Sequence, residues 1–387
     1  MNKNIISTRF INNHLKIAYI LSTILYIVLF VYFLNWITSD MMDYMDWVNQ
    51  IAVNGREAIK AYPFGYSPAS MLIFSASLLL PFPGYVSIKL LALPVVLISA
   101  LITSDLTFKL SGQKTAAWLA YTLTCLLPTI LVNTALWGQT DIYYSLVMLL
   151  TVYFFLHHKP YAALAAWGIA ISLKAPPLFL GPFLLFLFIK KQIPWKAILI
   201  PPMIYILCAI PFLLLGAPPE KTLGIYFSQT GSFHSLCMNC ASIWSFFPSI
   251  DYQTGLISGI LLTLAGVLGY LWIMLKKIDP ADPSKIVLAA LLSAILMPFL
   301  LPKMHERYFF FAELLSVCLI FLDWRFLLAA VLLQISTGSA YWHYLMHNAS
   351  VLSTGISTTI NLLVIGLLFW ALFKPASKPS PLPEGQA

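Results

Sequence analysis

Acidic and basic side chains gather in four short segments of this chain, and each segment borders a long apolar run. The segments are TSDMMDYMDW (38–47), WGQTD (137–141), SLKAP (172–176) and KMHER (303–307). Their ionisable side chains include Asp40, Asp43, Asp46, Asp141, Lys174, Lys303, His305, Glu306 and Arg307. A carboxylate can accept the proton of a hydroxyl nucleophile, and Lys, His and Arg can stabilise the charge on a departing phosphate. The pattern is typical of group transfer from a phosphate-linked donor to a hydroxyl.

The sequence also indicates what kind of donor to expect. No Gly-rich loop that could cradle the phosphates of a soluble nucleotide is present. The charged segments border apolar runs, and ionisable groups at membrane depth usually face a water-filled cavity. A lipid-phosphate sugar, approached from the bilayer, therefore fits better than a soluble nucleotide sugar.

The composition predicts an all-α integral membrane protein. Of 387 residues, 60% are hydrophobic and 9% are charged, whereas a soluble domain carries about 25% charged residues. Apolar runs of about 17 to 25 residues recur along the chain, which is the length that crosses a bilayer. Because the Lys and Arg residues lie mostly in short links between these runs, the net charge of +8 indicates topology and contacts with anionic membrane lipids rather than nucleic-acid binding.

The distribution of basic links predicts the topology. The first apolar run, about 17–37, has no cleavage site after it and is interpreted as a signal anchor with its basic N-terminus inside. Counting onward gives about twelve transmembrane helices and both termini in the cytoplasm. We expect one membrane domain over 1–375, external loops at 38–85 and 216–253, and a disordered cytoplasmic tail at 376–387.

Two apolar stretches do not resemble ordinary spans. Residues 69–82 are short and end at PFPG, so we expect a short helix on or in the outer face. Within 161–189, Pro176 and Pro177 remove backbone donors, which predicts two short helices that meet at a break. Lys174 would lie at that break and face protein or water.

Structural explanations compete with the functional ones. Asp43 and Asp46 have the spacing of the wet face of an interfacial helix. Asp141 could cap the helix that begins at about residue 142, and Trp137 could belong to an interfacial aromatic belt. The basic residues of KMHER could extend to lipid head groups, although that explains its adjacent His and Glu less well.

The only closely spaced cysteines are Cys237 and Cys240, in CMNC. This spacing allows either a disulfide or half of a metal site, and a single CxxC favours neither strongly.

The order of these motifs resembles the GT-C superfamily of glycosyltransferases, and most closely the bacterial proteins related to GPI mannosyltransferase 2. Asp40 is followed by Tyr44 and, fifteen positions after the acid, by Gly55, as in the first external loop of many GT-C enzymes. GYSPASML (65–72) is similar to the family's tyrosine-proline segment and contains Tyr66, although Ala69 replaces the usual second proline. Three segments are close matches to the bacterial subgroup and occur in its order: NTALWGQTDIYYS (133–145), ISLKAPPLFLGP (171–182) and LPKMHERYFFFAE (301–313).

The resemblance implies a role for each residue that matches a family motif. It implies that Asp40 is the catalytic base, with Asp43 as its competitor, and that Tyr44, Tyr66 and Trp137 belong to the substrate site. It places Gln139 and Asp141 at the sugar or acceptor, and Lys174, His305 and Arg307 near the donor phosphate. Glu306 would orient its neighbours. The implied fold is a GT-C-like bundle with short helices in a long first extracytoplasmic loop.

The resemblance also implies the reaction and its location. The donor would be a polyprenyl-phosphate sugar, with mannose as the expected hexose, and transfer would invert the anomeric carbon. The acceptor could be a glycolipid, a glycan or a protein. The location would be the bacterial inner (plasma) membrane, with the active site on the extracytoplasmic side. No cofactor is required; the carboxylates could hold one divalent cation, but no spacing demands a metal site.

Two other functions remain open at this point. A lipid-linked sugar flippase or another transporter would also carry buried charges and a Pro-broken helix. An O-antigen ligase or polymerase would use a lipid-linked oligosaccharide in a related fold. A transporter would concentrate charge near the midplane and often contain repeats, whereas here the polar segments are expected on one side and no repeat is evident.

Overall fold

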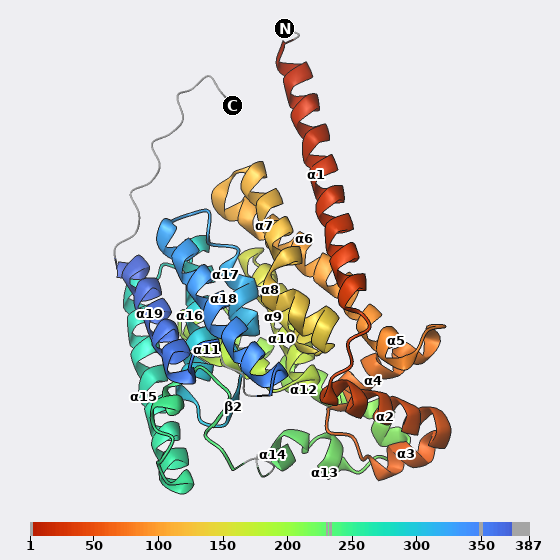
Figure 1. Ribbon diagram of the computed structural model, residues 1–387. Coiled ribbons are helices and arrows are strands. Elements are labelled where there is room, and N and C mark those ends of the chain that lie inside the picture. The colour runs from red at the N-terminus through yellow and green to blue at the C-terminus, as the bar shows by residue number, and fades with distance from the viewer. Residues whose placement is uncertain (1–2, 230, 232–233, 348–350, 374–387) are drawn as a thin grey trace.

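Helices make up nearly the whole molecule, as the composition predicts (Figure 1). The computed structural model describes residues 3–229, 231, 234–347 and 351–373, with side chains from residue 14 onward. In these ranges the only strands are β1 (Cys237–Met238) and β2 (Met304–His305). The expected disordered tail, 376–387, lies outside the described residues.

The helices follow one another with short connections. Up to residue 131 they are α1 (Lys3–Phe33), α2 (Ser39–Asn54), α3 (Arg56–Ala61), α4 (Pro68–Ala76), η1 (Ser77–Leu79), α5 (Gly84–Leu90), α6 (Ala92–Ser111), α7 (Lys114–Leu126) and α8 (Pro128–Leu131). The next are η2 (Val132–Trp137), α9 (Asp141–Leu156), α10 (Pro160–Leu173), η3 (Pro176–Leu180), α11 (Gly181–Ile189), η4 (Trp195–Leu199) and α12 (Ile200–Leu214). The remainder are α13 (Pro219–Thr222), α14 (Ile225–Gln229), η5 (Ile243–Phe246), α15 (Tyr252–Lys277), α16 (Pro283–Leu300), α17 (Phe310–Ser316), α18 (Trp324–Leu345) and α19 (Thr354–Phe373).

Six of the described helical segments are long and apolar enough to cross a bilayer. They are His14–Phe33, Gly84–Ser111, Trp195–Leu214, Tyr252–Lys277, Pro283–Leu300 and Thr354–Phe373. A seventh would be the pair Lys114–Leu126 and Pro128–Trp137, which bends by 41°. The chain is therefore an all-α membrane protein.

The expected number of about twelve spans is not confirmed by these lengths. Helices α9 and α10 contain 16 and 14 residues, which correspond to only about 24 and 21 Å of helix. A hydrocarbon core is about 30 Å thick. These helices are also largely buried by their neighbours, since α9 packs against α6, α10 and α17.

Both unusual apolar stretches form the structures expected from their prolines. In 69–82, the nine-residue helix α4 continues into η1 and ends at Leu79, before PFPG. In 161–189, α10 ends at Leu173, and η3 and α11 follow after the break. Lys174 is the first residue beyond α10.

The short helices α2 to α5 lie together at the end of the bundle where α1 finishes (Figure 1). Helix α4 contacts α10 and α12, while α2 contacts α4 and α5. Buried Lys89, in α5, donates hydrogen bonds to the backbone oxygens of Leu34 (3.2 Å), Trp36 (2.5 Å) and Leu136 (2.8 Å). One side chain thereby ties the end of α1 to the end of η2.

The 216–253 loop is joined to the KMHER segment by strand pairing. Strands β1 and β2 are parallel, with Cys237 opposite Met304 and Met238 opposite His305. Cys237 and Cys240 form a disulfide, so the first of the two interpretations of CMNC is the one observed.

The length of α15 generates a test of the membrane assignment. Its 26 residues extend about 39 Å, so Ser249 and Lys277, which are both exposed, should lie on opposite sides of the bilayer. We expect a membrane-impermeant maleimide to label one of Ser249→Cys and Lys277→Cys in intact cells, and the other only after permeabilisation. The parent protein should carry Cys208→Ser, because Cys208 is partly exposed. Labelling of both positions from the same side would show that α15 does not cross.

Candidate active site

The four polar segments meet at one end of the bundle, and a proline break helps to assemble them. Leu173 lies four residues before Pro177, which has no N–H, so the helical partner of the Leu173 carbonyl is missing. The hydroxyls of Ser67 and Ser70 donate to this carbonyl instead, at 3.0 and 2.6 Å. This contact docks α4, and with it the first loop (38–85), onto the broken helix.

Asp40 lies in the first turn of α2, behind its N-cap Thr38. Its carboxylate oxygen Oδ2 accepts hydrogen bonds from Trp137 Nε1 (2.6 Å), Gln139 Nε2 (2.7 Å) and the hydroxyl of Tyr344 (3.4 Å). All these donors reach the same oxygen. The carboxylate is therefore held in one orientation, with Oδ1 left to other partners.

Asp43, the competing acid, is not brought to this cluster. Helix α2 buries Met41, Tyr44 and Val48, whereas Asp43 and Asp46 are exposed. Asp46 accepts a hydrogen bond from Gln50 (2.6 Å). Both acids thus occupy the wet face of an amphipathic helix, which is the structural explanation that their spacing allowed.

Gln139 connects Asp40 to two tyrosines of the first loop. Its Oε1 accepts from the Tyr44 hydroxyl at 3.0 Å, and the hydroxyls of Tyr44 and Tyr66 are 3.0 Å apart. Because its Nε2 donates to Asp40, both ends of the Gln139 amide are engaged. The chain of contacts runs from Asp40 through Gln139 and Tyr44 to Tyr66.

A glycine makes the WGQ turn possible. Gly138 has φ +77°, and a Cβ added there would lie 2.1 Å from Met41 Cε and 3.2 Å from Lys89 Cε. Only glycine adopts this conformation without strain and also allows α2 and α5 to approach so closely. The turn directs Trp137 and Gln139 to the same carboxylate.

The cations of the site are paired with buried acids. Asp141 accepts from Lys174 Nζ at 2.7 Å and from Asn133 Nδ2 at 2.9 Å, and its Oδ2 lies 3.7 Å from Arg307 Nε. The side chains of Asp141, Lys174 and Arg307 are only 0, 9 and 11% exposed. Thr140, which precedes α9, forms no side-chain cap. The Asp141 carboxylate therefore serves an ion pair rather than only a helix end.

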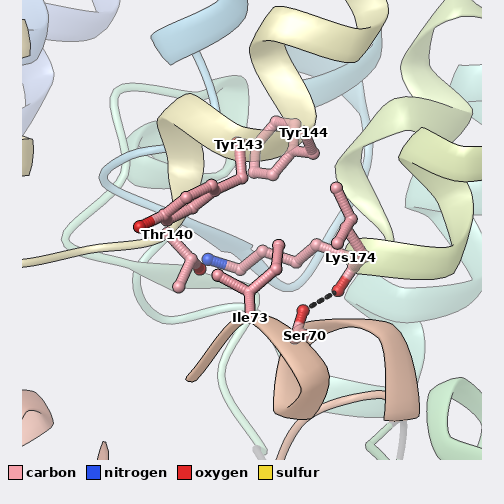
Figure 2. A pocket seen from close by; sticks show the side chains of 7 residues that line it. Ser70, Ile73, Thr140, Tyr143, Tyr144 and Lys174 are labelled. Atoms are coloured by element: carbon pink, nitrogen blue, oxygen red, sulfur yellow. Dashed lines mark hydrogen bonds between the residues drawn. The ribbon is translucent and has the colours of Figure 1, made fainter. Parts of the chain in front are cut away.

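Figure 2 shows how tightly Lys174 is enclosed. Its side chain extends past Ile73 toward Thr140, and the hydrogen bond from Ser70 to the Leu173 carbonyl lies below it in this view. The crevice between Lys174 and Thr140 leaves no room for a water molecule. The Lys174 amine also lies 5.3 Å from the ring centre of Tyr66, within the range of a cation–π contact.

Glu306 bridges its two neighbours in KMHER. It pairs with Arg307 Nη1 at 2.5 Å, and its Oε2 lies 3.8 Å from His305 Nδ1. Burial opposes ionisation of Glu306, but the charge of Arg307 and the contact with His305 outweigh it, so the pKa of Glu306 is lowered and the group is a carboxylate. Burial lowers the pKa of His305, so its imidazole is neutral at pH 7.

Arg307 points into the protein rather than toward lipid head groups. Its guanidinium lies 5.5 Å from the ring centre of Trp137, the same indole that donates to Asp40. Trp137 is fully buried and is therefore not part of an interfacial belt. The contact links the KMHER segment to the WGQTD segment.

A cavity of about 580 Å³ opens beside these cations. Its basic lining residues are Lys174, Lys303, His305 and Arg307. On another side it is lined by apolar residues that include Leu178, Phe179, Met297 and Leu301. No carboxylate is among its described lining residues, because Asp141 and Glu306 lie behind the cations that they neutralise. We call this space the basic cavity.

Several contributors were not foreseen from the sequence. Asn133 donates a hydrogen bond to Asp141, and Tyr344 donates one to Asp40. Tyr308 lines the basic cavity. Tyr344 gives no sequence signal, because tyrosines near helix ends are common in membrane proteins. Lys89 does give a sequence signal, because it is a single lysine in an apolar run. Among the described residues, no group of three His, Cys, Asp or Glu side chains is placed to hold a metal ion.

The comparisons with known proteins do not identify a family. No protein-family model matches the chain, and no curated protein matches it. The resemblance to GT-C enzymes therefore stays a prediction that rests on the motifs.

The buried ion pairs generate a prediction about stability. Lys174→Met would leave Asp141 with less compensation, and removing one partner of a buried pair costs about 3–5 kcal/mol. Lys60→Met is the matched control, because its pair with Glu57 is 2.6 Å long but 43 and 72% exposed and should contribute less than about 1 kcal/mol. The loss of stability in each variant can be measured as a change in the free energy of unfolding, by titrating the protein with SDS in mixed micelles. Equal losses would contradict the assignment of Lys174 to a buried network.

Proposed function

We propose that this protein is a GT-C-type membrane glycosyltransferase. It transfers a hexose, with mannose as the first candidate, from a polyprenyl-phosphate donor to a hydroxyl acceptor. The finer architecture belongs to the same proposal: about twelve crossings in the bacterial plasma membrane, with the site on the extracytoplasmic side. Support comes from the order of the motifs and from the contacts among Asp40, Gln139, Asp141, Lys174 and Arg307.

The observation that carries the proposal is the two-sided lining of the basic cavity. Lys174, His305 and Arg307 line one side, and apolar side chains of η3 and α16 line another. A phosphate joined to a hydrocarbon chain has the same division of charge and apolar surface. Arg and Lys bind phosphate oxygens with charge-assisted hydrogen bonds, so a lipid phosphate suits this cavity better than a neutral metabolite does.

The acidic partners of the cations make this binding possible. Without a ligand, Asp141 and Glu306 neutralise Lys174 and Arg307, which avoids the cost of isolated buried charges. Each cation has more than one donor, and both line the cavity. Remaining N–H groups can therefore bind phosphate while the pairs stay intact.

Asp40 is suited to be the base because its orientation is fixed. Trp137, Gln139 and Tyr344 all hold Oδ2, so Oδ1 is the oxygen that can accept a proton. Asp40 is partly exposed and does not line the basic cavity. Donor and acceptor would thus approach from different sides of the Tyr44–Gln139–Trp137 group.

The proposed step is a single displacement. The acceptor oxygen forms a bond to the anomeric carbon from the side opposite the phosphate, while its proton passes to Asp40 Oδ1. The bond from the anomeric carbon to the phosphate oxygen breaks, and its electron pair leaves with polyprenyl phosphate. Arg307 and Lys174 stabilise the charge that develops there. The configuration at the anomeric carbon is inverted.

The transporter alternative has weaker support. A lysine at a proline-broken helix is also found in substrate pathways, and Lys174 has that position. However, the paired charges gather at one end of the bundle, beside the first external loop, and they are anchored by many hydrogen bonds.

An O-antigen ligase-like activity would use the same basic cavity with a longer donor and is distinguished by the donor panel below.

Replacing the proposed base should abolish transfer. Purified protein is incubated with a panel of polyprenyl-phosphate hexoses and with acceptor fractions from bacterial membranes, and released polyprenyl phosphate is measured by mass spectrometry. Asp40→Asn should reduce the rate by about 10²–10⁴-fold, the usual contribution of a general base.

The control is Asp46→Asn, a change in an exposed acid of the same helix, which should leave the rate unchanged. Asp43→Asn compares the two candidate bases directly. An active Asp40→Asn variant would eliminate Asp40 as the base, and failure of the wild-type protein with every donor would eliminate the proposed function.

His305 should make donor affinity depend on pH. Its pKa is lowered in the free protein, and a bound phosphate would raise it again by favouring the charged imidazole. Binding therefore takes up a proton between these two pKa values. Donor affinity should increase as the pH falls through the bound-state pKa, by up to about tenfold per pH unit, and level off below the free-state pKa.

The phosphodiester has no second proton to titrate, so it does not contribute to this profile. His305→Gln, which keeps a polar side chain, should flatten the pH dependence of the donor KM between about pH 5 and 8. A wild-type KM that does not vary over this range would place the phosphate away from His305.

A further inference from the structure

A second cavity, of about 380 Å³, lies next to the basic cavity. This volume falls within the roughly 300–1,000 Å³ of small-molecule sites. The loop that contains the disulfide forms most of it, and the end of α18 closes it with His343. We call it the loop cavity.

Strand β1 forms part of the wall between the two cavities. Cys237 lines the loop cavity and Met238 lines the basic cavity, as expected for successive residues of a strand, whose side chains point to opposite faces. Lys303 lines the basic cavity, while its amine lies 5.7 Å from the ring centre of Tyr252, which lines the loop cavity. The two spaces are therefore direct neighbours.

The lining of the loop cavity is aromatic and polar but uncharged. Trp244, Phe247 and Tyr252 supply rings, and His234, Asn239 and His343 supply hydrogen-bonding groups. No Asp, Glu, Lys or Arg is among its described lining residues. A phosphate would find no fixed cation there, and a lipid tail would leave the polar groups without partners.

This combination suits a neutral sugar. A pyranose ring has apolar C–H faces that pack on aromatic rings and hydroxyls that bind amides and imidazoles. Trp244 is held in place by a hydrogen bond from its Nε1 to the Leu300 carbonyl (2.8 Å). The Nδ1 of His343 is buried and has no hydrogen-bond partner within the described residues, a condition that costs about 1–3 kcal/mol.

Helix α18 connects this cavity to the proposed base. The residue after His343 is Tyr344, whose hydroxyl donates to Asp40 Oδ2 (3.4 Å). The Tyr344 ring stacks on Trp137, with ring centres 4.8 Å apart. A ligand in the loop cavity thus contacts the same helix end that orients Asp40.

We propose that the loop cavity binds a neutral sugar unit of the acceptor. This inference rests on the proposed function and deepens it, because it makes the acceptor a glycan or the saccharide part of a glycolipid. The sugar in the loop cavity positions the acceptor, and another hydroxyl of the same acceptor reaches Asp40.

The test measures binding without any donor. Full-length protein in lipid nanodiscs, which avoid sugar-based detergents, is titrated with mannotriose, maltotriose and chitotriose, and binding is followed by saturation-transfer NMR. We expect at least one trisaccharide to bind the wild-type protein. Phe247→Ala and Asn239→Gly should each weaken this binding about tenfold.

The variants are chosen to preserve the fold. Phe247 is 51% exposed, and Asn239 has φ +54°, a conformation that glycine also adopts. The matched control is Phe246→Ala, because Phe246 is 43% exposed but does not line the cavity. The Phe246→Ala variant should bind the trisaccharide with the same affinity as the wild-type protein.

The outcomes separate this inference from the proposed function. If no trisaccharide binds, or if both cavity variants bind as tightly as the control, the loop cavity is not a sugar site, whether or not the protein transfers hexose. If a trisaccharide binds and both cavity variants weaken it, the sugar site stands. Donor assays that then show no release of polyprenyl phosphate would overturn the transferase proposal alone.

Discussion

Burying Lys174 and Arg307 is possible only because Asp141 and Glu306 are buried beside them. These four residues come from three segments that are far apart in the chain, so the ion pairs hold α9, the break after α10 and the loop before α17 in one arrangement. Removing any one charge would leave a buried partner with less compensation. The geometry of the basic cavity depends on this balance.

A second set of contacts extends the same arrangement to the first loop. The carbonyl oxygens that bind Lys89 and the Leu173 carbonyl are backbone groups at helix ends. Buried backbone groups of this kind need partners, and here Ser67 and Ser70 of the first loop and Lys89 of α5 supply them. The loop is thus joined to the bundle by polar contacts that are specific in position, in addition to the packing of Tyr44 and Phe74.

The sequence predicted the class of fold and most members of the cluster for physical reasons. Low charge content and long apolar runs determine a helical membrane protein, and Pro176 and Pro177 determine the break beside Lys174. Charged residues in an apolar chain are costly, so Asp40, Asp141 and Arg307 were conspicuous. The pairing of Asp141 with Lys174 and the outward orientation of Asp43 were not predictable, because they depend on how α2 and α9 rotate in the packed bundle.

The number of crossings and the contacts of Tyr344 and Lys89 were harder to predict for a related reason. Hydropathy does not separate a span from a short apolar helix that is buried by protein, and α9 and α10 are shorter than the six candidate spans. Tyr344 reaches Asp40 across 304 residues of sequence, and nothing local to position 344 indicates this contact. Lys89 was detectable as an isolated charge, but its carbonyl partners follow only from the tertiary structure.

The docking of α4 on the broken helix also affects how the protein is made. Ser67 and Ser70 are synthesised about a hundred residues before Leu173, their acceptor. During translation the first loop is therefore made without this partner, which follows in the segment that ends at the proline break. The contact between α4 and the broken helix can therefore form only after residue 173 has been made. A ribosome-bound chain that stops before residue 173 would contain the proposed base but not the carbonyl on which Ser67 and Ser70 dock.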